Sequence, residues 1–241
     1  ESGEFIGVIG HTGSGKSSLM QIIDGLIKPT SGVVLLDGQD INAKDYDKKQ
    51  LRCKVGMVFQ YPEYQLFEEN VLKDVCFGPK NMGIESKGAE LKAREALEMV
   101  DFPQEFYLQS PFFLSGGQKR KAAIAGILAM EPDVLILDEP TAGQDKRGTM
   151  ILEELMDALG KEGTGVITIT HDMEFVARNF DRVIVMSHKN IIADGSASDI
   201  FSNTAILEEA KIKMPQLTEL AMRFGYKGDY FQPEQLVRIF D

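Results

Sequence analysis

The sequence predicts an α/β fold around a parallel sheet, with a helical segment inserted into it and a helical extension at the C-terminal end. Several short apolar runs each end at a polar residue and lead into segments with helical spacing of apolar residues. From about residue 62 to residue 130 the helical period replaces this alternation. Alternating strands and helices indicate a parallel sheet, and the long helical stretch indicates an insertion into it.

Composition limits what the chain can do. It has 241 residues with 43% hydrophobic and 26% charged residues, as expected for one globular α/β domain with a small insertion. The net charge of −11 argues against binding along a nucleic-acid backbone. The two cysteines lie far apart and form no metal-binding or redox pattern, which favours a reduced, cytoplasmic protein. No apolar run is long enough to span a membrane.

The first apolar run, Phe5 to Ile9, leads into a phosphate-binding P-loop. The segment Gly10 to Ser17 fits the pattern G-x-x-x-x-G-K-[ST], and an amphipathic helix follows it. A glycine-rich turn without function is the alternative, but the strand–loop–helix context favours phosphate binding through backbone N–H groups and a helix N-terminus. The predicted nucleotide-binding residues are Gly10, His11, Thr12, Gly13, Ser14, Gly15, Lys16, Ser17 and Ser18.

Three other apolar strands also end at chemically useful residues. Gln60 follows one, Asp138 and Glu139 follow the second, and His171 follows the third. Ligands of open α/β sheets bind at the carboxyl ends of the strands, so we expect these groups at the same edge as the P-loop.

Each of these residues has a predicted role in phosphoryl transfer. Ser17 and Asp138 would hold Mg²⁺, and Glu139 would orient the attacking water. His171 would contact the γ-phosphate, and Gln60 would reach Mg²⁺ or the water. The alternatives are a solvent-facing acidic pair at 138–139 and an incidental Gln60; His11 and His188 have no position that singles them out as catalytic.

A second anion site is predicted at Leu114 to Gln118, where a serine and two glycines open a helix. Its residues are Ser115, Gly116, Gly117 and Gln118. One nucleotide needs only one P-loop, so the second site suggests use across a dimer. The basic run Lys119 to Lys121 would strengthen the local attraction for anions.

These motifs, in this order, resemble the ATP-binding-cassette (ABC) ATPases. The resemblance covers the P-loop, Gln60, the signature Leu114 to Gln118, the Walker B residues Asp138 and Glu139, a D-loop at Ala142 to Asp145, and His171. It implies ATP and Mg²⁺ as cofactors, with Glu139, His171 and Gln60 as catalytic residues and Asp145 near the nucleotide. Gln144 and Lys146 depart from the Leu and Pro that are usual in the family.

Within that family the chain is most similar to the ATPases of energy-coupling-factor transporters, of the second paralogue type. The resemblance rests on the P-loop, Phe59 to Phe67, Phe77 to Pro79 and Ala125 to Pro132. It implies a paralogous ATPase as partner, with a homodimer possible, a transmembrane coupling protein docking near Gln60 to Phe67, and a substrate-binding membrane protein. The implied function is uptake of a vitamin or a Ni/Co ion, at the cytoplasmic face of the membrane.

The resemblance also implies a domain plan. Residues 1–201 would form the ABC ATPase domain, with a helical subdomain at about 62–130, and residues 202–241 a dimerisation extension. We expect further strands and an adenine-stacking aromatic residue upstream of residue 1.

Other functions fit the sequence less well. One alternative is a soluble ABC ATPase of DNA repair, chromosome structure or translation. Chromosome-type members carry a long coiled coil between Gln60 and the signature, and translation-type members fuse two cassettes; this chain has a short interval there and one cassette. A kinase or GTPase does not account for the signature. The apolar residues Tyr64, Leu66 and Phe67 fit either a docking surface or the core.

The C-terminal extension contains two short amphipathic segments, each with a proline at a predicted first helical position. Pro215 opens the first, with Leu217, Leu220, Ala221 and Phe224; Pro233 opens the second, with Leu236, Val237 and Phe240. Such short helices need a surface to pack on. That surface is either the chain's own core or the partner ATPase, in which case the extension clasps the dimer.

Overall fold

The computed structural model describes residues 2–224, and in it the chain divides into two compact units. One, which we call the signature unit, comprises Glu1–Glu4 and Met20–Val166. The other, which we call the P-loop unit, comprises Phe5–Leu19 and Ile167–Asp241. The segment opening at Pro233 lies outside the described residues.

The P-loop unit is built on a small mixed sheet. Strand β1 (Phe5–Ile9) pairs in parallel with β7 (Arg182–Ser187), and β8 (Asn190–Ser196) pairs antiparallel with β7. The last residues of β6 (Gly165–Ile169) flank β1 on its other side, where the Thr170 N–H donates to the Val8 carbonyl at 3.4 Å. Helices α7 (Met173–Asn179), α8 (Ala197–Ser202) and α9 (Thr204–Ala210) bury Phe175 and Phe201.

The signature unit contains a second group of parallel strands. Strand β4 (Val55–Val58) pairs with β5 (Val134–Asp138) over its whole length, and the first residues of β6 follow, with Gly165 N–H donating to Asp133. Every residue of β4 is buried. Both strand groups thus contain the parallel pairing that the sequence predicts.

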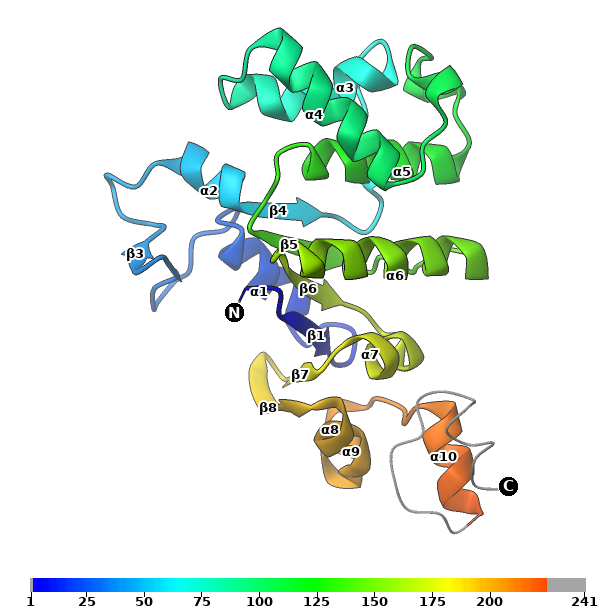
Figure 1. Cartoon of the computed structure of the whole chain (residues 1–241). Coiled ribbons are helices and arrows are strands. Elements are labelled where there is room, and N and C mark those ends of the chain that lie inside the picture. The colour runs from blue at the N-terminus through cyan, green and yellow to red at the C-terminus, as the bar shows by residue number, and fades with distance from the viewer. Residues whose placement is uncertain (1, 225–241) are drawn as a thin grey trace. The chain divides into compact units, whose positions relative to one another are not determined.

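The helices of the signature unit follow the predicted periodicity closely. The segment from Pro62 to Leu128 contains α3 (Val71–Asn81), α4 (Ser86–Met99) and α5 (Gly116–Leu128), which lie side by side in Figure 1. Short 3₁₀ helices η1 (Pro62–Gln65), η2 (Gln104–Phe106) and η3 (Pro111–Phe113) connect them. Helix α6 (Lys146–Lys161) carries apolar residues at helical spacing and buries them: Leu152, Leu155, Met156 and Leu159. Helix α1 (Lys16–Ile23) begins in the P-loop unit and ends in the signature unit.

Two local predictions differ from the structure. The polar segment before Arg52, which carries no apolar periodicity, contains helix α2 (Lys48–Lys54), capped by the Asp47 carboxylate. The apolar run Val33 to Leu36 indicates a four-residue strand, but only β2 (Leu35–Leu36) forms, and it pairs antiparallel with β3 (Gln39–Asp40) as a small hairpin.

Helix α10 (Gln216–Arg223) belongs to the first C-terminal segment, with Pro215 as its N-cap rather than its first helical residue. Its N-terminus is held by the Glu174 carboxylate of α7, which accepts from Gln216 N–H. Thr218 and Ala221 are buried, whereas Leu220 and Phe224 of the predicted stripe are exposed. The helix therefore packs on its own unit through small residues and leaves larger apolar ones in solvent.

Among residues 2–224, no helix has the length and apolar character needed to cross a membrane.

Glycine at position 56 allows α5 to lie directly on strand β4. A Cβ atom there would come 2.6 Å from Ile127 Cγ2 of α5 and 3.2 Å from Pro132 Cγ. Atoms in a close-packed interior cannot absorb such an overlap without moving the helix.

We therefore expect Gly56→Val to destabilise the protein by about 1–3 kcal/mol, because a side chain at this strand position overpacks the interface with α5. Urea unfolding followed by circular dichroism measures the change. Gly126→Ala is the control on α5 itself, where an added Cβ meets no atom within 4 Å. It should raise the unfolding free energy by up to about 1 kcal/mol through helix propensity. Equal stability of Gly56→Val and wild type would contradict the packing constraint.

Candidate functional site

In the P-loop unit, the loop between β1 and α1 depends on backbone conformations that favour glycine. Gly10, Gly13 and Gly15 have φ angles of 146°, 82° and 104°. At Gly10 a Cβ would lie 2.1 Å from the Met186 carbonyl of β7. The loop is therefore folded tightly against the end of the neighbouring strand, with its N–H groups leading into the N-terminus of α1.

Lys16, the first residue of α1, is buried and turns back over the loop. Its ammonium donates to the Gly10 carbonyl at 2.7 Å and to the His11 carbonyl at 3.1 Å. Ser14 is fully buried, and its Oγ has no hydrogen-bond partner among the described residues. A buried cation beside a buried hydroxyl favours an anionic ligand at this loop.

The hairpin between β7 and β8 supports the P-loop from the side. Lys189 N–H donates to the Ser14 carbonyl at 3.1 Å, and the His188 ring meets the His11 ring edge-on at 5.5 Å. His188 and Lys189 both adopt positive φ, as two-residue hairpin turns require. The sequence gives no sign of this role, because residues so far apart in the chain meet only in the folded unit.

His171 is exposed and follows β6 in the same unit. The residue before it, Thr170, hydrogen-bonds to β1, the strand that leads into the P-loop. Asp172 then caps α7 by accepting from Phe175 N–H at 3.0 Å. Position 171 is thus fixed between a strand end and a helix cap, at the predicted edge of the sheet.

In the signature unit, Gln60, Asp138 and Glu139 also come together at one sheet edge. Val58 and Leu137 are register partners in the parallel pair β4–β5, so Gln60 and Asp138 follow neighbouring strand ends. Gln60 is exposed, and the two acidic residues are half-buried. The structure thus brings these three predicted site residues to the same edge within their unit.

Glu139 occupies a left-handed conformation that is uncommon for residues other than glycine, with φ of 50°. Its carbonyl accepts from Ala142 N–H at 3.1 Å, which closes a turn after β5. The Arg120 guanidinium of α5 donates to the carbonyls of the same turn. Arg120 was not predicted as a site residue.

This geometry corrects the prediction for the basic run after the signature. Arg120 is directed at backbone carbonyls, and Lys121 donates to the Asp101 carbonyl at 2.8 Å and its carboxylate at 3.3 Å. Two of the three cations thus have internal partners and do not serve mainly to attract anions.

The signature opens α5 with a complete capping box. Gln118 N–H donates to Ser115 Oγ at 3.3 Å, and Ser115 N–H donates to Gln118 Oε1 at 3.0 Å. Ser115, Gly116 and Gly117 are exposed at the helix start. The glycines carry no side chain over the first-turn N–H groups, so an anion can approach them closely.

The D-loop is shaped by two interactions at the start of α6. Asp145 is the N-cap and accepts from Gly148 N–H at 2.7 Å. The Gln144 side chain folds over Gly148, where a Cβ would come within 2.1 Å of Gln144 Oε1. The Gln144 side chain thus lies close over the first turn of α6.

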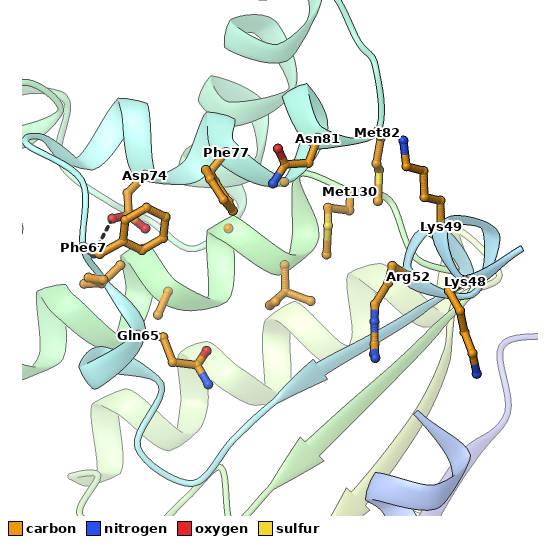
Figure 2. Close-up of a pocket in the computed structure, with 15 residues that line it drawn as sticks. Lys48, Lys49, Arg52, Gln65, Phe67, Asp74, Phe77, Asn81, Met82 and Met130 are labelled. Atoms are coloured by element: carbon orange, nitrogen blue, oxygen red, sulfur yellow. Dashed lines mark hydrogen bonds between the residues drawn. The ribbon is translucent and has the colours of Figure 1, made fainter. Parts of the chain in front are cut away.

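The signature unit also contains a groove, which the sequence indicates only in part. It encloses about 560 Å³ between α2, the segment Gln65 to Phe67, α3 and α5. Figure 2 shows Phe67 and Phe77 at one end and the basic side chains Lys48, Lys49 and Arg52 of α2 at the other.

Two interactions fix the ends of this groove. At the basic end, Arg52 donates to the buried Asp24 carboxylate at 2.7 Å. Burial raises the pKa of Asp24, and the neighbouring Arg52 opposes that rise. At the aromatic end, Asp74 accepts from Phe67 N–H at 2.8 Å (Figure 2) and from Glu68 N–H at 2.7 Å. Burial raises the pKa of Asp74, and these two hydrogen bonds oppose it.

The predicted docking residues differ in their exposure to solvent. Leu66 is buried and belongs to the core, whereas Tyr64 and Phe67 are 84% and 56% exposed. Phe67 also meets the Phe77 ring edge-on at 4.8 Å.

Comparison with known proteins decides the family. A family model described as "ABC transporter" matches residues 1–142. The energy-coupling factor transporter ATP-binding protein EcfA2 of Clostridium perfringens is 48% identical over 230 residues, which are 95% of this chain and 81% of that one. The protein of the same name from Bacillus thuringiensis is 49% identical over 217 residues, 89% of this chain and 74% of that one.

The chain belongs to the ABC transporter family.

Solved structures agree with this assignment. CbiO1 from Clostridium perfringens, described as part of the ABC transporter complex cbiONQ, has a TM-score of 0.75 and 36% identity, covering 92% of this chain and 88% of its own. The ATP-binding cassette MJ0796, solved as a dimer bound to ADP and Pi, has a TM-score of 0.72 and 30% identity, covering 82% and 87%. This chain is an ABC ATPase of the energy-coupling-factor type.

In this chain the Glu139 carboxylate is expected to orient the water that attacks ATP. We therefore expect Glu139→Gln to lower ATP turnover by more than about 100-fold while ATP still binds, because the amide keeps the size but not the basicity of the side chain. Phosphate release measures turnover, and equilibrium binding of a fluorescent ATP analogue measures affinity.

Glu131→Gln is the matched control. Glu131 also adopts positive φ, at 51°, but its exposed carboxylate pairs with Lys92 on α4. Its turnover should stay within about twofold of wild type. Residual turnover of Glu139→Gln within tenfold of wild type, about 1.4 kcal/mol of barrier, would contradict the assignment of Glu139.

Proposed function

We propose that this chain is one of two ATPases in an energy-coupling-factor importer, and that it couples ATP-driven closure of the pair to uptake of a vitamin or a Ni/Co ion. The observation that carries the proposal is its similarity, over nearly the whole chain, to transporter ATP-binding proteins. The partner ATPase is a paralogue of this chain, and the pair works at the cytoplasmic face of the membrane.

In this proposal each ATP is held by two chains. The P-loop of one chain binds the phosphates, and the exposed helix start at Ser115 and Gly117 of the other chain binds the γ-phosphate. The closed pair is then stabilised by ATP and opens once hydrolysis removes the γ-phosphate contacts, as in other ligand-biased two-state changes. Asp145 lies near the same nucleotide through the D-loop.

The proposal includes a magnesium ion. Mg²⁺ takes oxygen ligands and is usually held by one or two side chains together with nucleotide phosphates. The Ser17 hydroxyl at the first turn of α1, the Asp138 carboxylate at the end of β5 and the Gln60 amide oxygen would supply such ligands. When bound, the ion neutralises charge on the phosphates. His171 would contact the γ-phosphate from the P-loop unit.

The groove between α2, α3 and α5 is the proposed docking site for the transmembrane coupling protein, which also carries a substrate-binding membrane protein. Its aromatic end carries the exposed ring of Phe67 and the partly exposed ring of Phe77, which suit an apolar helix face. The alternative function, a soluble ABC ATPase of DNA repair or translation, gives this groove no occupant.

Phe77→Asp tests the docking site, because it places a charge at the aromatic end of the groove. We expect at least tenfold weaker association with the transmembrane subunit in detergent, with the ATP turnover of the ATPase pair unchanged within twofold. Leu91→Asp is the control, since Leu91 is exposed on α4 (59%, against 43% for Phe77) and does not line the groove. Unchanged association of Phe77→Asp would contradict docking in this groove.

The C-terminal extension is the proposed clasp between the two ATPases. Truncation after Lys213 should weaken the nucleotide-free pair by at least tenfold, while ATP-driven closure survives. The double variant Met222→Asp/Phe224→Asp changes two exposed positions, one within α10 and one just after it. It should also weaken the nucleotide-free pair. Sedimentation of each protein with its partner and without nucleotide measures the pair. An unchanged pair in both cases would leave packing on the chain's own unit as the role of α10.

A further inference from the structure

Arg120 is a buried cation with an unusual set of partners. It lies on the second turn of α5 with 8% of its surface exposed. Its guanidinium donates to the carbonyls of Ala142 at 2.8 Å, Pro140 at 2.6 Å and Glu139 at 3.3 Å. Burial lowers the pKa of Arg120, and the nearby Glu63 and Tyr61 oppose that fall; a guanidinium stays charged at neutral pH.

The three carbonyls belong to a single turn, the one that orients Glu139. Glu139 holds a left-handed conformation in this turn, and for a residue with a side chain that conformation costs about 1–2 kcal/mol. Such conformations persist only when surrounding interactions fix them. The turn's own hydrogen bond, from Ala142 N–H to the Glu139 carbonyl, is reinforced by the guanidinium on the same oxygen.

The same helix begins at the signature. Ser115 caps the helix five residues before Arg120, a distance of about 7.5 Å along the helix axis. The helix between them is regular and begins with a complete capping box, so both residues move with it as one body. A shift at the signature therefore reaches the carbonyls of the Glu139 turn through one side chain.

We propose that Arg120 is a positioning residue for ATP hydrolysis, which holds the Glu139 turn in its left-handed conformation and ties it to the signature end of α5. This inference rests on the proposed roles of Glu139 and Ser115. Arginine suits the task because its planar fork donates to several oxygens at once, whereas lysine offers one compact charge.

Two substitutions separate this role from a purely structural one. Arg120→Met removes the donors and keeps an unbranched apolar stem, and Arg120→Lys keeps the charge without the fork. We expect Arg120→Met to lower kcat about 30-fold or more with the KM for ATP changed less than threefold, and Arg120→Lys to lower kcat about tenfold or less. Lys121→Met is the matched control on the same helix, because Lys121 bonds to Asp101 and not to the turn. Its kcat should stay within twofold.

A double variant tests whether Arg120 acts through Glu139. In the Glu139→Gln background, where the oriented carboxylate is already lost, Arg120→Met should reduce the residual single-turnover rate by less than twofold. A loss as large as in the wild-type background would overturn the inference, since Arg120 would then act independently of Glu139. A kcat for Arg120→Met within threefold of wild type would overturn it as well.

Folding of the variants is followed by thermal unfolding monitored by circular dichroism. If Arg120→Met does not fold, Arg120→Lys and Arg120→Gln take its place, and equal kcat values for these two and wild type overturn the inference. Normal turnover of Glu139→Gln would instead contradict the proposed site itself, so the two failures are distinguishable.

Discussion

The close approach of helix α5 to strand β4 is the constraint on which the signature unit depends. It is possible because residue 56 has no side chain, and it holds α5 against the strand at Ile127. The N-terminus of α5 carries the signature, its second turn carries Arg120, and its last turns, with Ile127, line the groove. Strand β4 itself ends at Val58, two residues before Gln60. Helix α5 thus links the signature, the turn after β5 and the groove, and its contact with β4 is one of the interfaces that hold it.

The chain contains two helix starts suited to anions, and they differ in how they are built. The P-loop is built into its own unit, with a buried lysine, a buried serine and three glycines at positive φ. The signature has an exposed serine, two exposed glycines and no buried charged side chain of its own. A site with a buried cation suits a ligand held by its own chain, and an exposed helix start suits one brought by another chain. This contrast is the physical basis for proposing that ATP is shared between two ATPases despite the net charge of −11.

Much of the fold could be predicted because it depends on local patterns. The P-loop, the strand ending at Asp138 and the stripe of α6 are each encoded by neighbouring residues, and the structure confirms them as elements. Helix α2 was missed because it is short and polar and is fixed by the Asp47 cap and by Leu51 in the core. Pro215 was placed one residue too far into its helix, because a proline at the N-cap and one at the first helical position look alike in sequence.

The roles of Arg120 and His188 could not be predicted, for a different reason. A run of three basic residues looks like a solvated or anion-binding surface, and only tertiary structure shows that Arg120 faces a turn some twenty residues later in the chain. The contact between His188 and His11 likewise joins two distant loops. Long-range contacts of single side chains leave no periodic signal, whereas amphipathic helices and strand-end motifs do.

The central claim, that this chain is an ATPase of an energy-coupling-factor importer, is tested most directly by its natural partners. The measurement is purification of the tagged full chain from membranes of its native host in mild detergent, followed by quantitative mass spectrometry of the complex. The account predicts a stoichiometric complex with a paralogous or identical ABC ATPase and a transmembrane protein. Phe77→Asp should release the transmembrane protein from this complex, and Leu91→Asp should not. Recovery of the chain in the soluble fraction, bound to nucleic acid or ribosomes and free of any transmembrane protein, would contradict it.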